Sequence, residues 1–257
     1  MLFYMAPMEG MTGYVFRHAY HKRFGDIDRY FTPFLTNKKL NSRERNDILP
    51  EHNEGMELVP QILTNRAKDF LAIAKELERF GYTNVNLNLG CPSGTVAAKG
   101  RGAGFLEFPS RLDAFLAQIF EKCPLQISIK TRIGEDFPEE WEDLQRVYEK
   151  YPLEELIIHP CVQRDYYNNT PNWEVFGQAV SFSRHSICYN GDIRTPEDCA
   201  RFTDAFPDTE KIMIGRGIFT NPEKYRKKIK KANTLRGYQL AVESLFREQE
   251  LCGQKGV

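Results

Sequence analysis

Eight short apolar segments recur along the 257-residue chain, and the stretches between them are long enough to hold helices. The segments are residues 2–6, 29–34, 58–63, 84–89, 126–130, 156–159, 186–190 and 211–214. Short strands that alternate with helical segments are typical of successive β-α units, whose strands pair in parallel. Eight units in a chain of this length predict an α/β protein with a closed (β/α)8 barrel. The rival doubly wound sheet is disfavoured, because no GxGxxG pattern follows the first segment.

The intervening helices are supported by apolar residues at helical spacing. The clearest case is residues 66–80, where Phe70, Ile73, Ala74 and Leu77 recur every three or four positions. Thr195 suits the cap of a helix that begins at Pro196. The predicted helices are 12–24, 66–80, 112–121, 141–151 and 196–206. Residues 38–45 are interpreted as a polar, basic connection.

Composition narrows the class of protein. Basic and acidic residues number 35 each, so net charge gives no argument for a polyanion, and any such site depends on local patches. The six cysteines form no CxxC pair, which disfavours zinc sites and predicts no metal, and their scatter suggests a reducing compartment. The chain contains no apolar run of membrane-spanning length and begins without a basic leader. We therefore expect a soluble, cytoplasmic protein without a membrane partner.

The most informative stretch is residues 84–106. Val85, Leu87 and Leu89 alternate with polar residues, as in a strand, until Gly90-Cys91-Pro92 ends the alternation. Cys91 would then lie on a loop at the carboxyl end of a strand, which is the catalytic face of a barrel. The ordinary alternative for a single cysteine is a small apolar side chain packed in a loop.

Polar residues also gather at the ends of the other predicted strands. They include Pro7-Met8, Gln61, Asn88, Lys130, His159, Asn190-Gly191-Asp192 and Gly215-Arg216. Each has an ordinary explanation, such as a solvated strand end for Lys130 or a turn for Asn190-Gly191-Asp192. In a barrel, however, all of them meet on one rim. Glycines after the last two strands, with Arg216, predict a phosphate site and hence a phosphorylated cofactor or substrate.

These residues carry a resemblance to a known family. The motifs are APMEGMT, VPQI, NLNLGCP, VAAKGRGAGFL, IKTRIG, NGDI and GRG, in that order over about residues 2–222. The chain resembles the tRNA-dihydrouridine synthases. The resemblance implies an FMN-dependent (β/α)8 barrel, an oxidoreductase that reduces the C5–C6 double bond of uridines in tRNA with electrons from NADPH. It makes tRNA the expected partner.

The resemblance also implies roles for individual residues. Cys91 matches the general acid that protonates C5 of uracil, and Asn88 would lie near the uracil. Gln61 and Lys130 would contact the flavin ring, beside the backbone of Pro7, Met8 and Glu9. The ribityl phosphate would be held by His159, Asn190, Gly191, Asp192, Gly215 and Arg216. Arg132 is a candidate contact for RNA phosphate.

The chain departs from the family pattern in three places, one of which is a net charge of zero in a protein expected to bind tRNA. Cys161 follows His159 by two residues, where many members have arginine. Residues 1–222 are expected to form the FMN-binding barrel, and residues 223–257 a basic helical tail that is shorter than the family's helical tRNA-binding domain. Basic patches at 38–45, 99–101 and 226–231 are the local candidates for RNA contact.

Two other functions stay open from the sequence. One is an FMN oxidoreductase that acts on a small pyrimidine or enone, similar to dihydroorotate dehydrogenase. The other is a barrel that binds FMN or RNA without turnover. The modified uridine, the choice between NADPH and NADH, and the oligomeric state are not determined.

Overall fold

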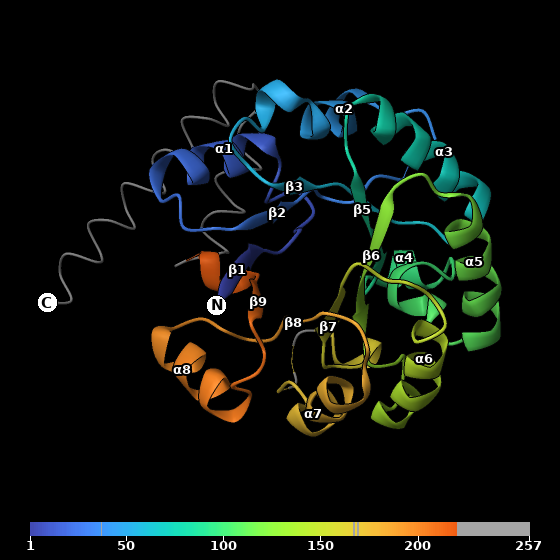
Figure 1. Cartoon of the computed structure of the whole chain (residues 1–257), viewed down its shortest axis with the longest axis vertical. Helices are drawn as coiled ribbons and strands as arrows, with labels where there is room; N and C mark the ends of the chain where they lie inside the picture. The colour runs from blue at the N-terminus through green and yellow to red at the C-terminus, as the bar shows by residue number, and fades with distance from the viewer. Residues whose placement is uncertain (37, 167, 169, 220–257) are drawn as a thin grey trace, which may run out of the picture.

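The computed structural model describes residues 1–36, 38–166, 168 and 170–219, and within them the strands form a barrel wrapped by helices (Figure 1). The strands pair in parallel, in the order β3-β2-β1-β9-β8-β7-β6-β5-β4. They are β1 (Leu2–Met5), β2 (Arg29–Phe31), β3 (Leu58–Val59), β4 (Gln61–Ile62), β5 (Asn84–Leu89), β6 (Gln126–Arg132), β7 (Leu156–His159), β8 (Ile187–Tyr189) and β9 (Lys211–Ile214). The predicted barrel is confirmed.

β3 and β4 are two parts of one predicted strand, separated by Pro60. β3 pairs with β2 and β4 pairs with β5, so this broken strand joins the two ends of the sheet. Proline has no N–H for a strand ladder, but the Pro60 carbonyl still accepts from the Asn86 amide at 2.9 Å. A bridge between Leu35 and Ile62 completes the contact on the other side. The barrel therefore has eight strand positions built from nine strands.

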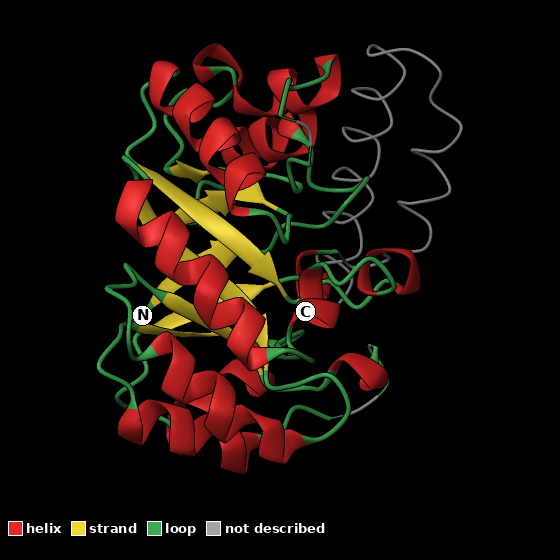
Figure 2. Cartoon of the chain, turned by 90° about the vertical axis from the view of Figure 1, so that its right-hand side faces the viewer, coloured by secondary structure: helices red, strands yellow, loops and turns green. Residues whose placement is uncertain are grey.

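Eight α-helices lie among the described residues, outside the strands (Figure 2). They are α1 (Tyr14–Arg23), α2 (Ser42–Ile48), α3 (Ala67–Arg79), α4 (Gly94–Ala97), α5 (Pro109–Lys122), α6 (Trp141–Tyr148), α7 (Trp173–Phe182) and α8 (Pro196–Ala205). Five of them fall in predicted helical segments, and Thr195 caps α8 as expected.

Two longer helices were not predicted. α2 lies in the stretch interpreted as a basic connection, and its first turn is closed by a capping box between Asn41 and Glu44. α7 begins where the Asn172 side chain accepts from the Val175 amide. Both starts carry a readable cap residue, so the reading of 38–45 as a mere connection was wrong.

The side chains of the strands alternate between the barrel interior and two cores shared with the helices, of which the smaller contains Met5, Tyr30 and Leu58. Val85, Leu87 and Ile129 pack with helix residues in the large outer core. The opposite set packs only with residues of other strands and fills the barrel interior: Tyr4, Ala6, Phe31, Val59, Ile157, Cys188 and Met213. By the same alternation, Asn86, Asn88, Ser128 and Lys130 face the interior. The barrel is therefore apolar on one side and polar along β4, β5 and β6.

Three expectations concern residues that the structure does not describe. The boundary at residue 222, the predicted tail 223–257 and the basic patch 226–231 lie outside the described residues. Among the described residues, no helix has both the length and the apolar character that crossing a membrane requires.

A buried arginine fixes the loop that follows β1. The Arg17 side chain on α1 is fully buried and donates to the Thr12 carbonyl at 2.8 Å and to Asn53 Oδ1 at 3.0 Å. It also donates to the Asp47 carbonyl at 2.6 Å and lies 3.6 Å from the Asp47 carboxylate, which ties α1 to α2. Thr12 Oγ1 in turn accepts from the Met8 amide at 2.8 Å. The position of the Pro7–Thr12 loop therefore depends on Arg17.

We expect Arg17→Met to lower the free energy of unfolding by about 3–5 kcal/mol, because it removes the cation beside the buried Asp47 carboxylate and the Arg17 donors to the Thr12 and Asp47 carbonyls. Urea denaturation followed by circular dichroism measures this. Lys22→Met, an exposed change on the same helix, is the matched control and should stay within about 0.5 kcal/mol of wild type. Equal midpoints for the two variants would contradict the role assigned to Arg17.

Candidate active site

The carboxyl ends of the parallel strands bring the expected residues to one rim. Pro7, Met8 and Glu9 follow β1, while Gln61 lies on β4 and Cys91 follows β5. The rest of the rim is contributed by Asn88, Lys130, Arg132, His159, Asn190, Gly191, Asp192, Gly215 and Arg216. Because the sheet is parallel throughout, all these groups face the same end of the barrel.

Cys91 is held in place from both sides. The Asn88 side-chain oxygen accepts from the amides of Gly90 at 3.1 Å and Cys91 at 3.0 Å. On the other side, the Ala103 amide donates to the Cys91 carbonyl at 3.1 Å. Gly102 adopts a φ of +56°, and a Cβ there would come within 2.9 Å of Cys91 Cβ. The glycine-rich run after the motif therefore packs directly against the cysteine.

The Cys91 thiol keeps its proton at neutral pH. It is half-buried, and burial raises its pKa above the ordinary value, although the Ser93 amide and the charges of Arg132 and Lys130 partly oppose this. A thiol of this kind is a weak nucleophile and a proton carrier. Its chemistry suits a general acid.

Lys130 on β6 and His159 at the end of β7 are titratable groups of the rim. Burial first, and then the charge of Arg132, lower the pKa of Lys130 to about 8. The pKa of His159 is also lowered, first by burial and then by Arg132, Lys130 and Arg216. Within the part of the chain that the structure describes, Lys130 Nζ makes no hydrogen bond or ion pair. The positive charge of Lys130, which no described carboxylate offsets, favours the binding of an anion at this rim.

The loops after β8 and β9 leave backbone donors free. The amides of Gly191 and Gly215 donate to no group among the residues described here. A side chain at Gly191 would overlap the Tyr189 ring, so glycine is required there. Asn190 Nδ2 donates to the Met213 carbonyl at 2.8 Å and ties the loop after β8 to β9. Free amides beside cations fit the phosphate of a flavin mononucleotide.

Asp192 and Arg216 pair with each other. Arg216 Nη2 donates to Asp192 Oδ1 at 2.5 Å. The carboxylate thus offsets part of the charge expected of Arg216 and orients its guanidinium at the mouth.

Arg132 takes a role different from the expected contact with RNA phosphate. Its side chain is fully buried, and its guanidinium donates to the Gly90 carbonyl at 3.1 Å and to the Val162 carbonyl at 2.7 Å. It also donates to the Tyr166 carbonyl. Arg132 therefore joins the Cys91 loop to the loop after β7, and a phosphate does not reach it in this arrangement.

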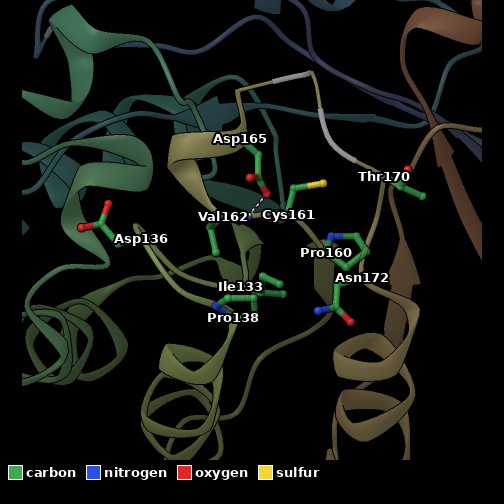
Figure 3. Close-up of a pocket in the computed structure, with 9 residues that line it drawn as sticks. All are labelled: Ile133, Asp136, Pro138, Pro160, Cys161, Val162, Asp165, Thr170 and Asn172. Atoms are coloured by element: carbon green, nitrogen blue, oxygen red, sulfur yellow. Dashed lines mark hydrogen bonds between the residues drawn. The ribbon is translucent and has the colours of Figure 1, made fainter.

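A cavity of about 370 Å³ lies beside the barrel mouth, between the loops after β6 and β7 (Figure 3). Its lining residues are Ile133, Asp136, Pro138, Pro160, Cys161, Val162, Asp165, Thr170 and Asn172. Burial raises the pKa of the Cys161 thiol to about 11, so this cysteine is protonated and unreactive at neutral pH. Cys161 thus contributes a neutral wall where many family members have an arginine.

The basic patches differ in how far they are neutralised. Lys38 pairs with Asp69 at 2.8 Å, Arg43 with Glu9, and Arg45 with Glu76 at 3.7 Å. Lys99 and Arg101, on the Cys91 loop, form no ion pair in the described part of the chain. The second patch therefore keeps more charge for a polyanion than the first. No cluster of three or more His, Cys, Asp or Glu side chains that could hold a metal occurs among the described residues.

Sequence reasoning missed two interior residues of the site, Asn86 and Ser128. Asn86 Oδ1 accepts from Gln61 Nε2 at 2.8 Å, and Asn86 Nδ2 donates to Ser128 Oγ at 2.9 Å. The signal for Asn86 was present, because it precedes Asn88 by two positions and so faces the same side of the strand. Ser128 carries no such signal, since its role depends on which strand lies next to β5.

Lys130, which has no partner in the described part of the chain, should reduce the stability of the folded state at neutral pH. We expect Lys130→Met to raise the free energy of unfolding at pH 7, because wild type must keep a cation where burial disfavours it. The advantage should shrink as pH rises from about 8 towards the unfolded lysine's pKa of about 10.4, since the native state releases its proton first.

Urea denaturation of both proteins at pH 7, 9 and 10 measures the difference. Lys150→Met is the control, because Lys150 Nζ pairs with Asp113 at 2.6 Å on the exterior and its loss brings no gain. A Lys130→Met protein less stable than wild type at pH 7 would contradict the analysis.

Comparison with known proteins agrees with this site. A family model described as dihydrouridine synthase matches residues 4–251. A probable tRNA-dihydrouridine synthase of Staphylococcus aureus (strain COL) is 30% identical over 237 residues, which cover 88% of this chain and 70% of the relative. A probable tRNA-dihydrouridine synthase 2 of Bacillus subtilis (strain 168) is 27% identical over 89% of this chain and 72% of the relative.

Solved structures show the same fold at low identity. A variant of NCR from Zymomonas mobilis aligns with a TM-score of 0.58 at 12% identity, over 92% of each chain. The N-acetylmannosamine-6-phosphate 2-epimerase from Clostridium perfringens aligns with a TM-score of 0.53 at 14% identity, over 89% of this chain and 91% of that one. The barrel is shared with these enzymes, whereas the motifs and the family match are more specific: the chain belongs to the dihydrouridine synthase family.

Proposed function

We propose that this protein reduces the C5–C6 double bond of uridine in tRNA to form dihydrouridine, with bound FMN and with NADPH as the electron donor. Membership of the family and the names of the curated relatives support the reaction. The single observation that carries the mechanism is the protonated thiol of Cys91 on the rim that also holds the ammonium of Lys130, which has no partner among the described residues.

The residues of the rim fit FMN. The free amides of Gly191 and Gly215, with His159 and Arg216, would hold its phosphate. Lys130 would place positive charge beside the ring, next to the backbone of Pro7–Glu9 and to Gln61. When bound, the flavin would supply a hydride to C6 of the uracil.

The chain's own chemical contribution is the second hydrogen. Cys91 Sγ would donate its proton to C5, so that one hydride and one proton together saturate the C5–C6 bond. Burial keeps the proton on sulfur at neutral pH, and Asn88 sets the position of the loop. The flavin would thus supply the electrons, and Cys91 would hold and donate the proton.

The first test is the reaction itself. Purified protein is incubated with FMN, NADPH and tRNA that lacks modifications, and dihydrouridine is counted by mass spectrometry of the nucleosides. We expect dihydrouridine above the control without enzyme. A flavin-loaded protein that oxidises NADPH but makes no dihydrouridine would overturn tRNA as the substrate, and a small pyrimidine would then be the candidate.

The role of Cys91 is tested by Cys91→Ala. We expect flavin binding and flavin reduction by NADPH to persist, while dihydrouridine formation falls about 10²–10⁴-fold, because only the proton donor is lost. Cys199→Ala on α8 is the matched control and should keep wild-type activity, since Cys199 is a half-buried cysteine away from the rim. Wild-type dihydrouridine formation by Cys91→Ala would remove Cys91 from the mechanism.

A further inference from the structure

Four polar side chains form a continuous hydrogen-bonded chain across the barrel interior. Asn88 Nδ2 donates to Gln61 Oε1 at 2.7 Å, and Gln61 Nε2 donates to Asn86 Oδ1 at 2.8 Å. Asn86 Nδ2 then donates to Ser128 Oγ at 2.9 Å. All four side chains are between 0% and 7% exposed, so none of these bonds is shared with bulk water. We call this set the amide relay.

The direction of the relay is fixed at the end next to Cys91. The amides of Gly90 and Cys91 can only donate, so the oxygen of Asn88 must face them. The nitrogen of Asn88 then faces Gln61, which must present its oxygen to Asn88 and its nitrogen to Asn86. The orientation of each amide thus follows from the backbone of the Cys91 loop, and the loop is restrained by the amides in return.

The relay is not explained by packing alone. The interior beside β1, β2, β7, β8 and β9 is filled by apolar side chains such as Phe31, Ile157 and Met213. Buried polar groups are tolerated only when fully hydrogen-bonded, and a partly satisfied chain of them costs more than apolar packing. The strand register places Gln61 beside Asn86 and Asn86 beside Ser128, so β4, β5 and β6 each contribute a residue to the amide relay.

We propose that Gln61 and Asn86 are positioning residues that act through Asn88 to set the place of the Cys91 thiol. The importance of this positioning for catalysis rests on the proposed function, whereas its effect on the reactivity of the Cys91 thiol does not. Gln61 is fully buried and both ends of its amide are engaged, so its part in the site includes supporting Asn88 and is not limited to contact with a flavin.

The position of the thiol decides which charges act on it. Arg132 and Lys130 face it from β6, and Glu9 faces it from the loop after β1. The two cations favour the thiolate, and the carboxylate and burial oppose it. If the relay is cut, Asn88 loses its restraint and the Cys91 loop gains freedom. The thiol then becomes more solvated and loses its proton more readily.

An isosteric pair of substitutions at Asn86 tests the relay. Asn86→Leu keeps the shape but leaves Gln61 Nε2 without an acceptor. Asn86→Asp keeps an acceptor for Gln61, and the Ser128 hydroxyl can rotate to donate to its other oxygen. The measurement is the rate at which iodoacetamide alkylates Cys91 between pH 6.5 and 10, by mass spectrometry of the peptide, on purified protein without tRNA or NADPH.

We expect Asn86→Leu to raise the alkylation rate at pH 7.5 at least threefold and to move the pH midpoint downward. Asn86→Asp should stay within about twofold of wild type. Ile157→Val is the control for a change in the apolar half of the interior and should leave both the rate and the midpoint unchanged. If Asn86→Leu does not fold, Gln61→Met tests the relay instead, because it removes the acceptor of Asn88 Nδ2.

The relay and the reaction can fail separately. Wild-type alkylation rates and pH midpoints in a folded Asn86→Leu or Gln61→Met protein would overturn the relay, even if wild type makes dihydrouridine. A wild type without dihydrouridine formation would overturn the proposed function, while shifted alkylation in the variants would still establish that the relay controls Cys91.

Discussion

The buried guanidinium of Arg132 is the interaction on which the reactive end of the barrel depends. One side chain donates to carbonyls of the Cys91 loop and of the loop after β7, so two connections far apart in sequence are held by a group from the strand between them. Its charge also reaches the thiol of Cys91, the ammonium of Lys130 and the imidazole of His159, and it acts to lower the pKa of all three. The same residue therefore shapes the rim and sets its electrostatics.

The barrel interior has two halves: one is apolar and stabilises the fold, and the other is polar and positions residues of the site. Tyr4, Phe31 and Ile157 fill the first half with apolar volume. The second half contains hydrogen-bonded amides and a lysine without a partner among the described residues. An apolar filling would serve folding at least as well, so the polar half is best understood through the chemistry above it.

Much of this arrangement was readable from the sequence, and the limits have physical causes. Strand ends such as Lys130 and His159 could be assigned because a period of two and a parallel barrel send them to one rim. α2 could not be predicted from the composition of residues 38–45, because four cations there are typical of a solvated connection, whereas three of them pair with carboxylates and Asn41 caps the helix. Arg132 and Ser128 could not be placed, because their roles follow from which strands are neighbours and in what register, and this is set by the whole ring.

Pro60 has a consequence for how the ring closes during folding. A strand that slips by one position turns its interior side chains outward, which here would send Gln61 into the outer core and Ile62 into the mouth. Pro60 has no N–H to donate to β5, although its carbonyl accepts from the Asn86 amide, and it stands between the pairs with β2, which end at Val59, and the pairs with β5, which begin at Gln61. The proline thus marks the point at which regular strand pairing passes from β2 to β5, and a one-residue slip would move this N–H-less residue out of that position.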